Sequence, residues 1–175
     1  EAMRKLALPV RLSHMAVRAA EEGHGLAAGE LAVLLTERGL GGNDVDLDSR
    51  WAKFRRDRSP QTNAARGLAR QIASAFPKGS GDAANAGGLL LLAYPDHAAK
   101  ARGKPGQFLL AHGRGAEIDP AHPLAVSLFL VVADMQGTAE RQRILSAAAI
   151  DEAALLDALK DKIANAAEIS FDAAK

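Results

Sequence analysis

Four basic residues lie in a stretch of the chain without acidic residues, between Asp96 and Glu117. They are Lys100, Arg102, Lys104 and Arg114, with His112 just before the last of them. Cations gathered beside turns can contact phosphate groups without reading a base sequence. These five residues therefore predict a surface for a polyanion, and we expect it to be single-stranded RNA or DNA.

Two glycine-rich segments could instead cradle a nucleotide. Residues 77–88 contain "KGSGDAANAGG", which lacks the GxxxxGK[ST] spacing that brings a lysine and a hydroxyl to the phosphates and magnesium. Gly113-Arg114-Gly115 lacks the third glycine of a dinucleotide fingerprint. The first segment is therefore interpreted as a plain loop and the second as a hairpin turn.

Other constellations for catalysis are missing from the sequence. The five histidines are dispersed without HExxH or HxH spacing, and no cysteine can supply a thiolate ligand, so no metal site is expected. "IDEAA" (150–154) is similar to a helicase ATPase box, but its last residue is Ala154 instead of histidine and no phosphate loop precedes it. Asp151 is therefore predicted to cap a helix, and the chain is expected to carry no ATPase site.

A second basic segment runs from Arg50 to Arg70, where seven Lys/Arg face a single acid, Asp57. The C-terminal stretch 151–175 is acidic, although the whole chain has a net charge of only +1. The favoured interpretation of the basic segment is the solvated face of a helix. Contact with a nucleic acid is the alternative that the sequence leaves open.

The elements that position these residues change character along the chain. Helical periodicity is found at residues 12–22, 26–38, 51–76 (broken at Ser59-Pro60) and 89–94, and again at 150–163. Short apolar runs separated by turns predict strands at 108–111, 128–132 and 144–148. The fold class is therefore α+β. No apolar run approaches the roughly 20 residues that span a bilayer, and we expect a cytoplasmic protein without membrane contact.

Six short motifs, taken in order, resemble the bacterial HrpB-type DEAH-box ATP-dependent RNA helicases. They are "LPVRLSHM" (8–15), "LAVLLTERG" (31–39), "LAYPD" (92–96), "LAHGRGAEID" (110–119), "HPLA" (122–125) and "AIDEAAL" (149–155). The matching region of that family follows the two ATPase domains. The resemblance covers nearly the whole chain, with an apparent deletion at Val10-Arg11 and a histidine at position 112, where asparagine is common.

The resemblance implies a domain order and an accessory role. It implies the end of a winged helix (about 1–10) and a ratchet-like helical bundle within 1–103, an OB-like β unit at 104–150, and a C-terminal helix and tail at 151–175. We count three or four strands where a barrel needs five, so the fifth is either unrecognised or beyond Lys175. Arg114 would contact the nucleic-acid backbone, and ATP and magnesium would bind to the ATPase domains of the parent protein.

Two other functions are kept beside this hypothesis. The alanine-rich helices could dock a protein partner, with the basic residues serving only solubility. A small independent enzyme has little support, because no acid, base or nucleophile constellation was found.

Overall fold

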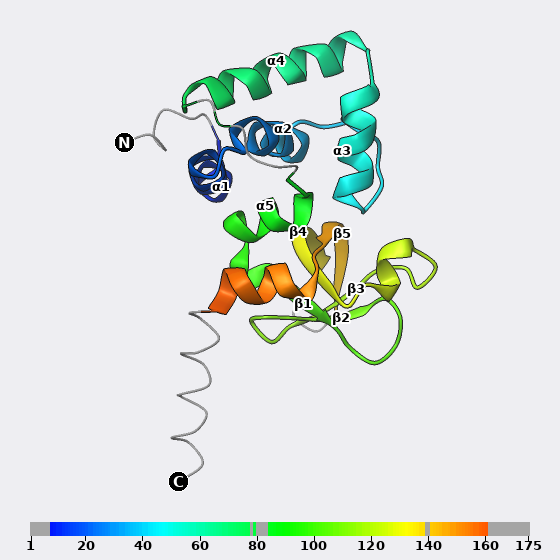
Figure 1. Cartoon of the computed structure of the whole chain (residues 1–175). Helices are drawn as coiled ribbons and strands as arrows, with labels where there is room; N and C mark the ends of the chain where they lie inside the picture. The colour runs from blue at the N-terminus through cyan, green and yellow to red at the C-terminus, as the bar shows by residue number, and fades with distance from the viewer. Residues whose placement is uncertain (1–7, 78, 80–83, 139–140, 161–175) are drawn as a thin grey trace.

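The computed structural model describes residues 8–77, 79, 84–138 and 141–160. The first part of the chain forms helices α1 (Val10–Glu21), α2 (Gly25–Thr36), α3 (Leu47–Arg56), α4 (Pro60–Ser74) and α5 (Ala86–Ala93). A short 3-10 turn, η2 (Pro95–His97), leads into the strands. Figure 1 shows the helices in the upper part of the molecule and the strands below them.

Helix α2 lies at the centre of the helical unit, because its residues from Ala28 to Leu34 are buried on every side. Helices α1 and α4 pack against it. Gly29 allows the contact with α4, since a Cβ atom at this position would lie 2.6 Å from the backbone oxygen of Ala69. The absence of a side chain on Gly29 therefore sets how closely the two helices approach.

The predicted break at Ser59-Pro60 is confirmed. Ser59 caps α4 by accepting a hydrogen bond from the Thr62 N–H, and Pro60 occupies the first turn, where its missing N–H costs nothing. Asp46 caps α3 in the same way through the Asp48 N–H. Both caps stand in polar segments that the sequence places between apolar runs.

Five strands close into a small barrel. They are β1 (Ala98–Ala101), β2 (Gln107–Leu110), β3 (Gly115–Glu117), β4 (Phe129–Gly137) and β5 (Gln142–Ala149), in the spatial order β1-β2-β3-β5-β4. All neighbouring pairs are antiparallel except β3 with β5, which is parallel. The barrel confirms the α+β class and the expected small β unit after the helices.

Two barrel strands were not predicted from the sequence. The segment that forms β1 reads "AAKA" and the one that forms β3 reads "GAE", and neither contains the β-branched or aromatic residues typical of strands. The fifth strand therefore lies inside the chain and not beyond Lys175. Strand β1 also begins at Ala98, within the 1–103 range that the sequence assigned to the helical bundle.

After the barrel, a helix begins at Glu152 and continues to Lys160, the last described residue. Asp151 accepts a hydrogen bond from the Ala154 N–H at 2.8 Å, which confirms its predicted role as a cap. The predicted helix end at Ile163 lies outside the described residues. No helix in the described part of the chain has the length and apolar character needed to cross a membrane.

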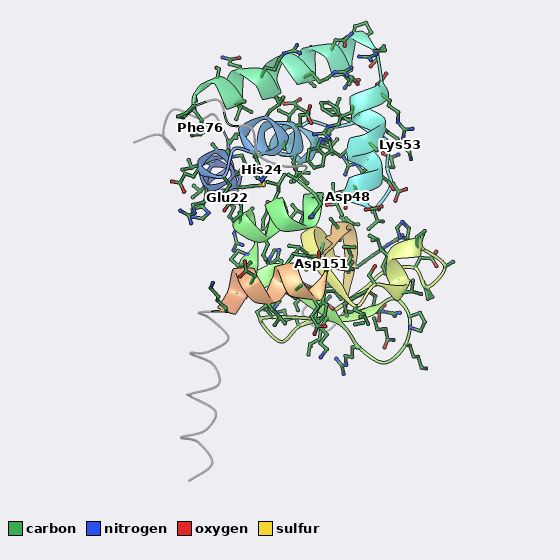
Figure 2. The ribbon with its side chains drawn as sticks, viewed as in Figure 1. Glu22, His24, Asp48, Lys53, Phe76 and Asp151 are labelled. Atoms are coloured by element: carbon green, nitrogen blue, oxygen red, sulfur yellow. The ribbon has the colours of Figure 1, made fainter. Side chains whose placement is uncertain are left out.

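Helix α5 joins the helical unit to the barrel. One hydrophobic core extends from the helices to Val131 of β4, Ala148 of β5 and Ile150. Asp48, at the start of α3, accepts a hydrogen bond from the Ala86 N–H at 3.0 Å, which ties α3 to the start of α5 (Figure 2). The helices and one side of β4 and β5 therefore share this core, whereas the inside of the barrel has a second core of its own, which includes Phe108, Leu130 and Ile144.

Candidate nucleic-acid interface

The five predicted site residues are all exposed, and they come from β1 and from the two connections that flank β2. Lys100 lies on the outer face of β1, opposite Leu109 of β2. Arg102 and Lys104 lie in the loop between β1 and β2, whereas His112 and Arg114 lie in the turn between β2 and β3. These two connections are at opposite ends of β2, but the Arg102 side chain extends toward the start of β3, where its Nη1 lies 3.9 Å from the Cβ position of Gly115, next to Arg114.

Arg102 and Lys104 flank a groove on the outer surface of β2 and β3. One hollow of about 220 Å³ is lined in part by Arg102, and an adjoining hollow of about 530 Å³ is lined in part by Lys104. Both hollows share Gln107, Glu117 and Arg141 in their walls. We call these five residues the barrel groove.

Arg141 is a member of the barrel groove that the sequence did not single out. It precedes β5, and its Nε donates a hydrogen bond to Glu117 Oε2 at 3.1 Å, while its side chain remains 80% exposed. In the sequence it stands in the short run Glu140-Arg141-Gln142-Arg143, which has a net charge of only +1 and does not stand out as a basic segment. Only the pairing of β3 with β5 brings Arg141 to the groove.

The contacts that the groove offers are electrostatic. Phe108, the one aromatic residue in its lining, is buried inside the barrel. The outward neighbour of Phe108 on β2 is the aliphatic Leu109, which is partly exposed. Stacking on bases therefore has no platform among the residues that line the groove, whereas three cations can reach phosphate oxygens.

His112, in the turn between β2 and β3, faces a different surface. Gly113 adopts a φ of 87°, which makes the tight turn possible, and the Leu110 N–H donates to the Arg114 backbone oxygen at 2.8 Å. The ring of His112 meets the edge of His97, with the ring centroids 6.0 Å apart. His112 therefore points toward the junction with the helices and not into the barrel groove.

The Tyr-Pro-Asp motif forms that junction. Tyr94 stacks on His97 with the ring centroids 5.3 Å apart, and the Arg11 guanidinium lies 5.4 Å from the centre of the Tyr94 ring. Arg11 also donates two hydrogen bonds to Asp96, at 2.6 and 3.1 Å. This hydrogen bonding lowers the pKa of the Asp96 carboxyl to about 2. The motif thus fixes α1 to the entrance of the barrel.

The His-Pro motif has a comparable structural role. The Leu124 N–H donates to Nδ1 of His122, so the proton of the neutral ring lies on Nε2 and points to Asp44 Oδ1, 3.0 Å away. This contact and a backbone hydrogen bond from Asp46 lower the pKa of Asp44, with the backbone contribution the larger. The loop after α2 is thereby attached to the turn η3 (Pro123–Val126).

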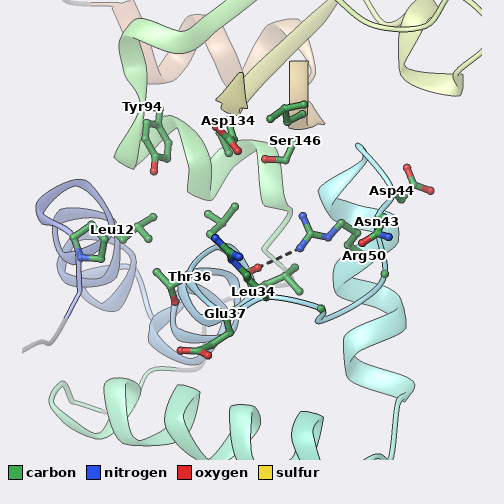
Figure 3. Close-up of a pocket in the computed structure, with 17 residues that line it drawn as sticks. Leu12, Leu34, Thr36, Glu37, Asn43, Asp44, Arg50, Tyr94, Asp134 and Ser146 are labelled. Carbon is green, nitrogen blue, oxygen red and sulfur yellow. Dashed lines mark hydrogen bonds between the residues drawn. The ribbon is translucent and has the colours of Figure 1, made fainter. Parts of the chain in front are cut away.

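A larger polar cleft of about 710 Å³ lies between the helices and the barrel (Figure 3). Its walls combine two cations, Arg38 and Arg50, with three carboxylates, Glu37, Asp44 and Asp134. This mixture gives no net attraction for a phosphate. Within the described residues, no group of three or more His, Cys, Asp or Glu side chains is arranged to hold a metal ion.

No family model matches this chain, and no curated protein matches it. Solved structures do match. A structure of the E. coli DExH-box NTPase HrpB superposes with a TM-score of 0.74 at 26% identity, over 89% of this chain. The expected resemblance to HrpB-type helicases is confirmed.

A second structure, of the E. coli DEAH/RHA helicase HrpB, gives a TM-score of 0.70 at 25% identity over 86% of this chain. The matched regions are 19% and 18% of the two HrpB chains, so this chain spans about a fifth of their length.

Proposed function

We propose that this chain is an accessory segment of an ATP-dependent RNA helicase and that its barrel groove binds the backbone of a single strand. ATP and magnesium would be bound by ATPase domains elsewhere in the parent protein, which would be the direct partners of this segment. The similarity to HrpB supports the helicase assignment. RNA and DNA remain alternatives as the bound strand.

One observation carries the proposal: cations from two different loops meet over the same two strands. Arg102 and Lys104 come from the β1–β2 loop, and Arg141 comes from the connection between β4 and β5. Five-stranded OB-type barrels bind oligonucleotides on the face that includes β2 and β3, between these same two loops. The chain therefore presents positive charge where such a barrel receives a strand.

Binding of a phosphate at the groove requires an exchange of partners. Arg141 must share or leave Glu117, and because this ion pair is exposed, its loss costs little free energy, about 0–1 kcal/mol. Lys100 would extend the track along the outer face of β1. Contacts of this kind do not depend on base sequence, which suits a strand that must move after each step.

Docking of a protein is the second candidate, and one feature favours it. Val126 and Leu128 are 76% and 69% exposed, beside the β1–β2 loop to which their segment is hydrogen-bonded. Exposed aliphatic residues next to a proposed nucleic-acid groove could contact the ATPase domains. Val126→Ser/Leu128→Ser should then weaken that association without changing RNA affinity.

Fluorescence anisotropy with a labelled 12-nucleotide single-stranded RNA tests the groove. We expect Arg102→Glu/Lys104→Glu to reduce the affinity at least tenfold and to make the salt dependence shallower, because about two phosphate contacts are lost. Arg18→Glu, on α1, serves as a control that also reverses a charge. Unchanged affinity in the double variant would contradict the proposal, and a larger loss with Arg114→Glu would move the site to the β2–β3 turn.

A further inference from the structure

The seven cations between Arg50 and Arg70 have two separate functions, and the first is structural. Arg50 Nη2 donates to the backbone oxygens of Leu34 and Leu40, both at 3.3 Å. Arg55 Nε donates to the buried Glu30 carboxylate at 2.7 Å, and its guanidinium lies 4.2 Å from the centre of the Trp51 ring.

Arg66 closes the corner between α3 and α4, because it donates to the backbone oxygens of Arg55 and Asp57. Together with Arg50 and Arg55, it belongs to the fold. These three arginines are therefore not available as a free charged surface.

The other four cations are exposed. They are Lys53 and Arg56 on α3, Arg58 in the connection, and Arg70 on α4, and we call them the α3–α4 face. No ion pair to an acid involves them among the described residues. Figure 2 shows Lys53 on the outer side of α3, away from α2.

The one acid within this segment, Asp57, is hydrogen-bonded to uncharged groups of the chain. The Asp57 carboxylate accepts hydrogen bonds from Thr62 Oγ1 at 2.6 Å and from the N–H and hydroxyl of Ser59, both at 2.9 Å. These donors, Thr62 first, lower the pKa of Asp57 to about 2. Helix α4 contains no acidic residue at all. Asp57 stays ionised and offsets one cation, and Lys53 also acts on the Asp44 carboxylate, but the segment from Arg50 to Arg70 keeps a net charge of +6 that can attract an external anion.

The chemistry of the face selects the kind of anion. Trp51 and Phe54, the aromatic residues of α3, are buried in the core, so bases have no surface for stacking. The face offers cations on two helices that meet at a corner, with the ionised Asp57 between Arg56 and Arg58. A nucleic-acid duplex presents phosphates on a rigid outer surface while its bases stay paired. Contacts between cations and phosphates are therefore sufficient to bind it.

The α3–α4 face is also far from the barrel groove. Figure 1 shows α4 at one end of the molecule and the strands β1 and β2 at the other. We propose that the α3–α4 face binds the phosphate backbone of double-stranded RNA, separately from the single strand in the groove. The inference takes RNA as the partner from the proposed function, but it uses none of the groove residues.

Two charge-matched variants of the whole 175-residue chain test this inference. Arg58→Glu/Arg70→Glu removes two cations from the α3–α4 face, and Arg102→Glu/Lys104→Glu removes two from the groove. Each is titrated by anisotropy with a blunt 16-base-pair RNA duplex and with the 12-nucleotide single strand. We expect the first variant to bind the duplex at least tenfold more weakly with unchanged single-strand affinity, and the second to show the reverse.

The outcomes separate the two proposals. Unchanged duplex affinity in Arg58→Glu/Arg70→Glu overturns the inference, as does a loss of equal size in both variants. If the unaltered chain binds no duplex at low salt, the inference also fails, and an acidic protein segment becomes the better partner for the face. If the groove variant has no effect while the face variant loses the duplex, the groove proposal fails and this one stands. Matching circular dichroism spectra show that both variants are folded.

Discussion

At the scale of single residues, the pair of Arg11 and Asp96 is where helix α1 is fastened to the entrance of the barrel. The two hydrogen bonds between them are bidentate, which is the strongest geometry for a guanidinium and a carboxylate. The Asp96 side chain is still 44% exposed, so solvent screening limits what the pair contributes to stability. We estimate this contribution at about 1 kcal/mol.

The pair should make stability depend on pH in the acid range. The pKa of Asp96 is about 2 in the folded protein, below its ordinary value of 3.8, so its stabilisation is complete above about pH 5 and is lost as the pH falls toward 2. We predict that Asp96→Asn is about 1 kcal/mol less stable at pH 7 and that the difference vanishes near pH 2. Urea unfolding at several pH values measures it. A difference that persists at pH 2 would contradict this origin.

Residue types predicted some local roles and missed others for a physical reason. The role of Asp151 as a cap depends on nearest neighbours in the chain, and this prediction is confirmed. The position of Arg141 beside Glu117 depends on β3 pairing with β5, across 24 residues of sequence. The count of charges along the chain therefore identified the cations of the β1–β2 loop, but it did not identify Arg141, which reaches the groove from the connection between β4 and β5.

At the scale of elements, the crossing of α2 and α4 depends on one missing side chain. A Cβ atom on Gly29 would lie 2.6 Å from the Ala69 backbone oxygen, so the helices must separate to accept it. We predict that Gly29→Ala destabilises the fold by about 1–3 kcal/mol, although alanine is the better helix former. Unfolding in urea, followed by the fluorescence of Trp51, gives the difference.

Gly67 in α4 provides the matched control. It is also inside a helix, but a Cβ atom there would meet nothing within 4 Å. Gly67→Ala should therefore stabilise the protein, by up to about 1 kcal/mol, because only helix propensity changes. Equal effects of the two substitutions would show that the helix contact at Gly29 is not close.

The helices could be predicted from the sequence and two strands could not, because a helix depends on the local spacing of apolar residues whereas a strand depends on its pairing with distant segments. The period of apolar residues marks α1, α2 and α4 directly in the sequence. Strand β1 is extended because Ala99 pairs with Leu110 on one side and with Leu130 on the other. Such pairing is a property of the closed barrel and leaves no pattern in "AAKA".

At the scale of the whole molecule, the proposed functions need the helices and the barrel to act as one body. The shared core reaches from the helices to Val131 and Ala148, and α5 lies against both β4 and β5. At the contact, a Cβ atom on Gly87 would lie 2.3 Å from the Ala149 backbone oxygen. This close approach leaves no space for a side chain between the two units.

We therefore predict a single cooperative unfolding transition. Trp51, the one tryptophan of the chain, reports on the helices, and the backbone amide NMR signal of Val132 reports on the barrel. Both should change at the same urea concentration, because separating the units would expose the core that they share. Gly87→Val should push the units apart and split the transition in two.

Separate transitions in the unaltered chain would mean that the two units fold independently. The α3–α4 face and the barrel groove would then have no fixed relation through which a duplex and a single strand could be held together.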